Sequence, residues 1–378
     1  MHKLTAGGHD YFLVDSDVDL AAVCYEQAKN DWVAVDTEFE RSSTYYPELC
    51  LVQLTTIGQV AVIDPLAIQD MGPLVELIFN SRITKVFHAG RQDLEIFHHL
   101  YDRVPTPIFD TQIAAQLLGL EEQSSYATLV KHLLGVELDK SHTRTNWKIR
   151  PLSGGQLKYA AEDVIYLAQV YELIRQRLSD AGILEWLKDD FAALQSPALY
   201  DVDPYDCWRR IRQARRLSES EVAVLQQLAA WREMTARREN IPRNWLLSDT
   251  LLVDLSRLQP QSSLDLTRMQ GLNKRFLAKH GSALLHLIAT ADRTGKKDLV
   301  QAENRQPLGM EQKRLVEKMF EVVQQKQRQY NLRENSIVTQ KGLEALVRNG
   351  ANAQLQQGWR YQLVGKELFA LLEHSDGC

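Results

Sequence analysis

The 378-residue sequence contains no uninterrupted apolar run of the roughly 18 residues that a membrane-spanning helix requires. Its first eight residues contain no apolar core of a secretory signal peptide. The four cysteines form no CxxC pair and lie far apart, at Cys24, Cys50, Cys207 and Cys378. This spacing argues against a zinc knuckle and against a disulfide framework. We therefore expect a cytoplasmic protein that makes no membrane contact.

The composition also lacks the biases of disordered and fibrous chains. Apolar residues make up 44% of the sequence and charged residues 25%, which is average for soluble domains. Long disorder and collagen-like repeats are thereby excluded. The length is sufficient for two or three domains.

The charge is unevenly divided along the chain. Residues 1–204 contain 16 Lys or Arg against 30 Asp or Glu, a net charge of −14, whereas residues 205–378 contain 28 against 19, a net charge of +9. Concentrated carboxylates can hold cations, and a basic half can hold a polyanion. The alternative is that both halves merely have solvated charged faces.

The first 200 residues alternate strand and helix patterns. Apolar, β-branched runs at 32–35, 51–55 and 60–63 lie close enough together to form antiparallel hairpins. Two further strands, at 84–87 and near 108–109, each follow a helical segment. The order predicts an α/β domain with a mixed five-stranded sheet and flanking helices. The helical patterns cover roughly 71–80, 91–100, 111–119, 124–134 and 156–177.

The strand patterns stop at about residue 205, and apolar residues then recur at helical spacing. Pro197 and Pro204 bracket a segment typical of a linker. Residues 240–247 have a weak echo at 331–338, which favours two copies of a small helical domain. Chance similarity between amphipathic helices is the alternative. The predicted domains are 1–200, 205–295 and 300–378.

Two carboxylates follow the first of the hairpin strands. Asp36 and Glu38 are two residues apart, so their side chains share one face of the strand. Neighbouring carboxylates repel each other unless a cation or a proton neutralises them, which makes the pair a candidate seat for a hard divalent metal. Exposed edge strands often carry such pairs, and this is the alternative interpretation.

Two more carboxylates and a tyrosine lie in helical segments. Asp93 falls in the first turn of the helix after the fourth strand, where it could also simply stabilise the helix N-terminus. Tyr159 and Asp163 are four residues apart and share a helix face. Taken separately, they are better explained as a core aromatic and a surface carboxylate.

In their order along the chain, these segments resemble the three motifs of the DEDD family of 3′-5′ exonucleases. Residues 35–39 are similar to its first motif, 88–93 to its second and 159–163 to its third. Tyrosine rather than histidine in the third motif resembles the tyrosine subgroup. The resemblance covers about residues 30–180 and implies an RNase H-like fold.

The C-terminal half resembles the paired all-α HRDC domains that follow the nuclease domain in some members of this family. Residues 238–242 fit the first copy, and residues 359–361 fit the second. The second copy has Arg333 where the first has Pro242.

The resemblance implies a cofactor of two divalent ions, Mg²⁺ or Mn²⁺. Asp36 would bridge both ions, and Glu38, Asp93 and Asp163 would complete their shells. Tyr159 would orient the attacking water, because a tyrosine hydroxyl with an unperturbed pKa near 10 is a poor general base at neutral pH. The implied reaction is two-metal-ion hydrolysis from the 3′ end, which releases nucleoside 5′-monophosphates.

Substrate contacts are predicted for residues near the motifs. Phe39 would abut the terminal nucleotide and His88 would hydrogen-bond its ribose, although either could be a core residue. Lys140 and Arg144 could hold backbone phosphates or form a solvated basic loop. The remaining candidates are Tyr46 and Gln53.

The resemblance implies a monomeric exoribonuclease acting on tRNA precursors or other structured small RNAs. A DNA 3′-5′ exonuclease is one alternative, because the motif residues touch phosphate and metal far more than the 2′-hydroxyl. A catalytically silent nucleic-acid-binding adaptor is another, against which the complete carboxylate set argues. Basic runs at 209–212 and 215–216 would add non-specific RNA affinity, or are only solvated.

Overall fold

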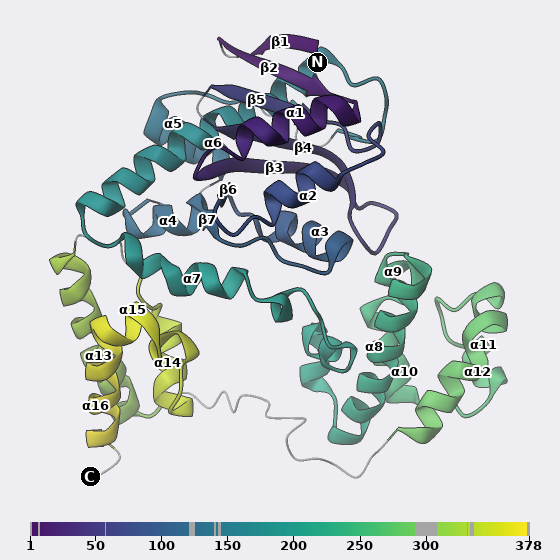
Figure 1. Ribbon diagram of the computed structural model, residues 1–378. Coiled ribbons are helices and arrows are strands. Elements are labelled where there is room, and N and C mark those ends of the chain that lie inside the picture. The colour runs from purple at the N-terminus through teal and green to yellow at the C-terminus, as the bar shows by residue number, and fades with distance from the viewer. Residues whose placement is uncertain are drawn as a thin grey trace. The chain divides into compact units, whose positions relative to one another are not determined.

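The computed structural model describes residues 2–6, 8–56, 58–120, 125–139, 141–142, 145–291, 308–330, 332 and 336–375 (Figure 1). Contacts within the chain divide it into two units. The first contains residues 1–40, 49–199 and 307–378, and the second contains residues 41–48 and 200–306. The predicted linker between the two prolines therefore spans one of the boundaries between these units.

A mixed sheet forms the centre of the first unit, with the strand order β1-β2-β5-β4-β3-β6-β7. Strands β4 and β5 are antiparallel, whereas β3, β6 and β7 run parallel. Residues 60–63 are almost completely buried, which explains why this central segment reads as a continuous apolar run. The predicted mixed sheet is confirmed. Its five predicted strands are β3 (Trp32–Glu40), β4 (Glu48–Thr56), β5 (Gln59–Ile63), β6 (Thr84–Phe87) and β7 (Ile108–Asp110).

Two N-terminal strands, β1 (His2–Ala6) and β2 (His9–Val14), enlarge the sheet beyond the five strands that the sequence predicts. β2 pairs in parallel with β5, and β1 follows it at the edge. An edge strand exposes polar residues such as Lys3 and Thr5, so it lacks the apolar run that marks a buried strand.

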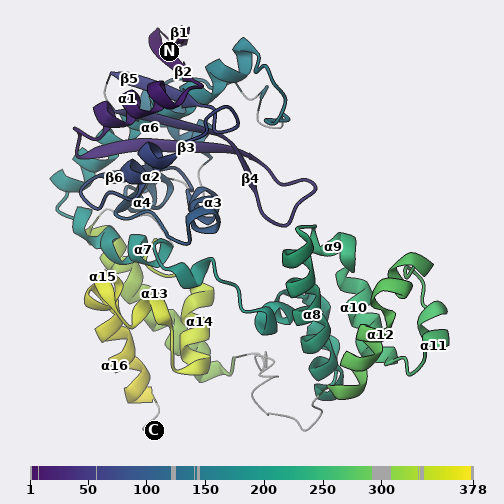
Figure 2. The same cartoon turned by 45° about the vertical axis from the view of Figure 1, so that its right-hand side comes forward.

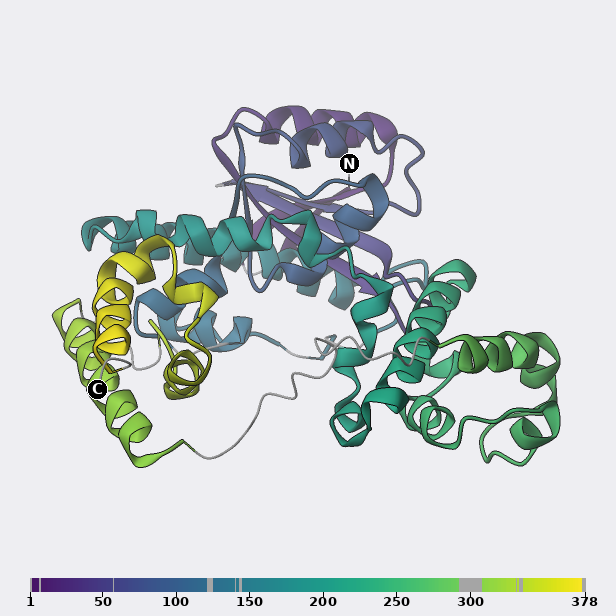
Figure 3. The same cartoon turned by 90° about the horizontal axis from the view of Figure 1, so that it is seen from below.

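Helices cover both faces of the sheet. Helix α1 (Asp17–Gln27), which the sequence patterns missed, packs against α2 (Gly72–Ile78), and α6 (Gly154–Asp180) contacts β3 and β5. Figure 3 shows the purple α1 and the teal α6 on opposite sides of the sheet. The remaining predicted helices are α3 (Arg91–Tyr101), α4 (Thr111–Leu117) and α5 (Tyr126–Leu134).

Helix α6 begins with a capping box and buries one apolar face. The Ser153 hydroxyl accepts a hydrogen bond from the backbone N–H of Gln156, whose side chain accepts from the Ser153 backbone. Ala160 and Val164 are completely buried and pack with Val62 of the sheet. Helix α6 is therefore held against the strand that carries Asp36 and Glu38.

The C-terminal helices of the first unit are α13 (Met310–Gln329), α14 (Gln340–Asn349), α15 (Gly358–Arg360) and α16 (Lys366–Ser375). The Trp359 ring stacks on Trp186, with 5.0 Å between centroids. Arg360 Nη1 lies 2.6 Å from Asp190 Oδ1, in helix α7 (Leu187–Leu194). Residue 300 at the predicted domain boundary lies outside the described residues, as do Arg333 and half of the echo at 331–338.

The regular structure described between residues 200 and 291 of the second unit is helical. Its helices are α8 (Glu219–Glu239), α9 (Arg243–Leu246), α10 (Asp249–Leu258), α11 (Ser263–Thr267) and α12 (Lys274–Thr290). Helices α10 and α12 both pack on α8 (Figure 2). Their shared core includes the completely buried Leu228, Leu252 and Leu284.

Residues 41–48, which connect β3 to β4, belong to this second unit. Asn240 Oδ1 accepts hydrogen bonds of 3.1 Å from the backbone N–H groups of Tyr45 and Tyr46. The Tyr45 hydroxyl donates a hydrogen bond to the buried carboxylate of Glu233. The connection is therefore fixed to helix α8 and its C-terminal cap.

Among the described residues, no helix combines the length and the apolar character needed to cross a membrane. Cys24, Cys50 and Cys207 are buried and not disulfide-bonded.

Candidate active site

A cavity of about 550 Å³ in the first unit contains most of the predicted catalytic residues. Its walls come from β3, α5, α6 and the segments that follow β6 and precede α6. The lining residues are Asp36, Thr37, Glu38, Phe39, Glu40, His88, Tyr126, Thr145, Trp147, Tyr159, Asp163 and Leu167.

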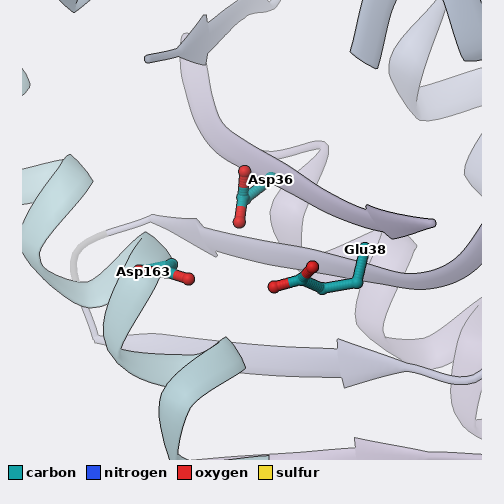
Figure 4. A group of neighbouring side chains, drawn as sticks. All are labelled: Asp36, Glu38 and Asp163. Atoms are coloured by element: carbon teal, nitrogen blue, oxygen red, sulfur yellow. The ribbon is translucent and has the colours of Figure 1, made fainter. Parts of the chain in front are cut away.

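Three carboxylates converge in this cavity. Asp36, Glu38 and Asp163 each offer an oxygen, and these oxygens all lie within 4.8 Å of one another. Figure 4 shows the two β3 side chains and the α6 side chain pointing toward a common space. The period of two along β3 places Asp36 and Glu38 on the same side, and packing of α6 on β3 adds Asp163.

Asp93 lies beside this group rather than in it. Its side chain is buried, with 8% of its surface exposed, and its carboxylate accepts a hydrogen bond from the Thr37 hydroxyl. Its charge nevertheless contributes to the raised pKa values of Asp36 and Glu38. Thr37 therefore links Asp93 to the strand that carries the first two carboxylates.

The turn from β6 into α3 determines where Asp93 lies. Ala89 has a left-handed backbone with φ of 55°, and Gly90 caps the helix. A Cβ atom at Gly90 would lie 2.5 Å from the Phe87 Cβ, so only glycine fits at this position. The Asp110 carboxylate accepts hydrogen bonds from the backbone N–H groups of Ala89 at 3.2 Å and Gly90 at 2.9 Å.

The carboxylates of the cavity strongly disfavour one another's ionisation. Withdrawal from water, followed by the charges of Asp163 and Asp93, raises the pKa of Glu38 to about 9. Burial and the neighbouring charges of Asp163, Asp93 and Glu38 raise the pKa of Asp36 well above its usual value. Burial also raises the pKa of Asp163 to about 8, although a hydrogen bond from Tyr159 opposes the rise. Crowded oxygen ligands with such unfavourable ionisation fit a hard divalent cation, which would compensate their charge.

Two tyrosines support Asp163. Tyr159 lies one helical turn before it and hydrogen-bonds its carboxylate. Tyr126, at the first position of α5, donates a hydrogen bond to the Asp163 backbone carbonyl. Burial raises the pKa of Tyr126 well above its usual value, and the charges of Asp163 and Asp36 add to the rise. The sequence patterns missed Tyr126, because this contact joins residues 37 positions apart.

Two of the predicted substrate residues reach the cavity. Phe39 and His88 both line it, and His88 Nδ1 lies 3.0 Å from the Thr111 hydroxyl. Trp147 also contributes to the wall, although it is 3% exposed and belongs to the core. The cavity therefore presents aromatic and polar groups beside its carboxylates.

The other predicted substrate residues are placed elsewhere. Gln53 is completely buried on β4, and its amide has no hydrogen-bond partner among the described residues, so it does not line the cavity. Tyr46 belongs to the connection between β3 and β4 in the second unit. Lys140 and Arg144 lie outside the described residues.

Sequence comparison connects this geometry to known enzymes. A family model described as 3′-5′ exonuclease matches residues 11–179, and an HRDC domain model matches residues 221–288. The chain is 38% identical to ribonuclease D of Acidiphilium cryptum, over 95% of this chain and 92% of that protein. It is 37% identical to ribonuclease D of Zymomonas mobilis, over 96% of this chain and 94% of the relative.

A solved structure matches along almost the entire chain. Escherichia coli RNase D, described as an exoribonuclease involved in structured RNA processing, is 30% identical to this chain. The match covers 96% of this chain and 99% of the other, with a TM-score of 0.82.

Proposed function

Because the chain belongs to the ribonuclease D family and is a 3′-5′ exoribonuclease, we propose that it trims structured RNA precursors such as tRNA. The products are nucleoside 5′-monophosphates. The observation that supports this proposal is the convergence of Asp36, Glu38 and Asp163 within 4.8 Å, with Asp93 beside them.

The exonucleases of this family use divalent metal ions, and the acidic cluster is a candidate site for them. The proposed cofactor is a pair of Mg²⁺ or Mn²⁺ ions, held by Asp36, Glu38, Asp93 and Asp163. When bound, two such ions activate water and stabilise the leaving oxygen of a phosphodiester. Asp36, whose pKa is raised by all three of the other carboxylates, is the proposed shared ligand.

The remaining roles belong to side chains that line the cavity. Tyr159 hydrogen-bonds Asp163, so its hydroxyl is fixed beside the cluster and can orient the attacking water. Phe39 and His88 contact the terminal nucleotide. Tyr126 holds the backbone of Asp163 and acts through it as a positioning residue.

RNA binding also involves the second unit. The HRDC domain is a nucleic-acid-binding module, and its match at residues 221–288 lies in the basic half of the chain. The protein is proposed to act as a monomer in the cytoplasm. The buried thiols of Cys24 and Cys207 form no disulfide bond, which supports a reducing location.

Hydrolysis of labelled substrates tests the proposal. The purified chain is incubated with a 5′-labelled tRNA precursor or with DNA of the same sequence, in Mg²⁺ or in chelator. We expect Mg²⁺-dependent stepwise shortening of the labelled RNA from its 3′ end as mononucleotides are released, and at least about a 10³-fold loss of kcat in Asp36→Asn.

Asp180→Asn is the matched control, because Asp180 is exposed at the end of α6 and lies away from the cavity. Its activity should equal that of the unsubstituted chain. Equal release from DNA would contradict the proposed preference for RNA, and release by Asp36→Asn at the normal rate would contradict the assigned site.

A further inference from the structure

A second cavity, of about 410 Å³, lies entirely within the second unit and shares no lining residue with the acidic cavity. Its walls are the connection at 41–48, the segment before α8, and helices α8 to α10. Its charged lining residues are Arg41, Arg210, Arg232, Arg243 and Asp249.

One of the four arginines is neutralised within the protein. Arg232 is 5% exposed, its Nη1 donates to the Leu247 carbonyl at 2.8 Å, and its Nη2 lies 2.8 Å from Asp249 Oδ1. Its Nε has no hydrogen-bond partner among the described residues. Asp249 is thereby engaged, which leaves Arg210 and Arg243 to be considered on the lining.

A buried carboxylate behind the cavity does not balance the remaining charge. Glu233 is 1% exposed and lies 3.0 Å from Arg237 Nη2 and 3.2 Å from Arg243 Nη1. Burial opposes its ionisation, but the hydrogen bond from Tyr45 and the charges of Arg243 and Arg237 outweigh this and lower its pKa. One negative charge is therefore shared between two guanidinium groups.

Arg210 carries the least compensated charge of the group. It is exposed, and it forms no ion pair with any carboxylate among the described residues. Apart from Arg41, whose Nε donates to the Tyr45 carbonyl at 3.1 Å, four arginines of the cavity and its rear wall face two carboxylates, which leaves an excess of two positive charges. An arginine fork is suited to two oxygens of one phosphate group.

We propose that this cavity binds a backbone phosphate of the RNA strand, with Arg210 and Arg243 as its principal donors. The inference rests on the proposed function, because the strand is the RNA substrate. The lining is mostly polar, whereas sites for small molecules are mostly apolar with a few polar groups. A phosphate within a longer strand therefore fits this cavity better than a free nucleotide does.

Binding measurements on the full chain test the proposal. The chain carries Asp36→Asn to prevent hydrolysis, and its affinity for a fluorescent single-stranded RNA of about 20 nucleotides is followed by anisotropy at several KCl concentrations. We expect Arg210→Gln to weaken binding about five- to tenfold and to reduce the salt slope by about 0.7. Arg210→Lys should keep the salt slope but lose part of the affinity, because it keeps the charge without the fork.

Arg268→Gln is the matched control. Arg268 is exposed in the same unit, its substitution removes the same charge, and it does not line the cavity. We expect this variant to bind RNA within about twofold of the Asp36→Asn parent.

The outcomes separate this inference from the function on which it rests. If Arg210→Gln and Arg268→Gln weaken RNA binding equally, the cavity is not a phosphate site and the inference is overturned. Inorganic phosphate or a nucleoside 5′-monophosphate can also be added as a competitor in the RNA-binding assay. If Arg210→Gln binds RNA with unchanged affinity but is no longer displaced by the competitor, the cavity binds a free anion and the inference is again overturned. An unsubstituted chain that releases nothing from RNA would contradict the proposed function instead.

Discussion

At the scale of single residues, the carboxylates of the acidic cavity oppose folding when they ionise. Glu38 has a pKa of about 9 in the folded chain, against an ordinary value of 4.5. Between these two values the unfolded chain binds fewer protons than the folded chain, so this group's contribution to stability falls as the pH rises. The loss is complete only above the folded pKa, and a bound divalent cation would compensate it.

The destabilisation by ionised Glu38 at high pH predicts how the stability of Glu38→Gln depends on pH. In chelator, we expect the variant to be more stable than the unsubstituted chain at pH 8.5 by on the order of 2 kcal/mol, and the difference to shrink toward pH 5. Denaturant titrations at both pH values measure it. Exposed Glu185 supplies the control, and Glu185→Gln should show a difference that does not grow with pH. A pH-independent difference for Glu38→Gln would contradict the assigned electrostatics.

Thr37 predicts a second effect at this scale. Its hydroxyl hydrogen-bonds Asp93, so Thr37→Val removes a partner that lowers the pKa of this carboxyl, now at about 6. We expect kcat/KM to fall about 10- to 100-fold and the Mg²⁺ concentration for half-maximal activity to rise. Thr37→Ser keeps the hydroxyl and should restore most of both quantities. Equal activity of the Val and Ser variants would show that the hydrogen bond is irrelevant to catalysis.

The sequence predicted the side chains that converge in the cavity better than the residues that support them. Asp36 and Glu38 follow from the period of a strand, and Tyr159 and Asp163 from the period of a helix. Tyr126 and Asp110 act through backbone groups 37 and 20 or 21 residues away, and no local spacing reports such contacts. Gln53 was predicted to contact the substrate but is completely buried. A polar residue within an apolar strand gives no sign in the sequence that its side chain is buried.

At the scale of elements, the turn between β6 and α3 leaves no room for a side chain at Gly90. We expect Gly90→Ala to destabilise the chain by about 2–3 kcal/mol, because its Cβ would overlap Phe87. We expect kcat/KM to fall by more than the loss of folded protein accounts for, because Asp93 moves with the first turn of α3. Gly154→Ala is the control at the start of α6, where a Cβ meets nothing within 4 Å, and it should be neutral or slightly stabilising. Denaturant titrations measure the stability of both variants, and kcat/KM measures their activity. Equal values for Gly90→Ala and Gly154→Ala would contradict the prediction.

The elements that the sequence failed to predict lie at the beginning of the chain. β1 pairs with β2, and β2 pairs with β5. The position of both strands in the sheet therefore depends on a partner some 50 residues away. Buried runs such as 60–63 are evident in the sequence because both of their faces are apolar, whereas β1 exposes its polar residues. Strand pairing over such distances cannot be read from local patterns.

At the scale of the whole molecule, the C-terminal helices are fastened to the nuclease half by a small aromatic and charged contact. Trp359 is 7% exposed, stacks on Trp186 and donates from Nε1 to Asp190 at 3.1 Å. We expect Trp359→Ala to cost about 3 kcal/mol and to increase amide hydrogen exchange in α7 and α13 to α16. Trp245→Ala, at a side chain that is 65% exposed, should change neither. Unaltered exchange in Trp359→Ala would show that the contact does not hold these helices.

The domain plan was predictable only in part. The change from strand to helix patterns near residue 205 and the basic charge of the second half were evident, and the HRDC match falls in that half. The sequence gives no sign that residues 41–48 group with 200–306, or that the last helices contact α7. The boundaries at 200, 205, 295 and 300 and the second HRDC copy remain predictions.

The connection between β3 and β4 has a consequence for anyone who wishes to exchange parts between relatives. Tyr45 and Tyr46 have their hydrogen-bond partners in Asn240 and Glu233. Removal of residues 200–306 would therefore deprive the loop at 41–48, which lies much earlier in the sequence, of these partners. A functional chimera would therefore have to import two pieces of sequence together, the donor's helical module and its matching eight-residue loop. Grafting either piece alone would leave a mismatched connection directly after the strand that carries Asp36 and Glu38.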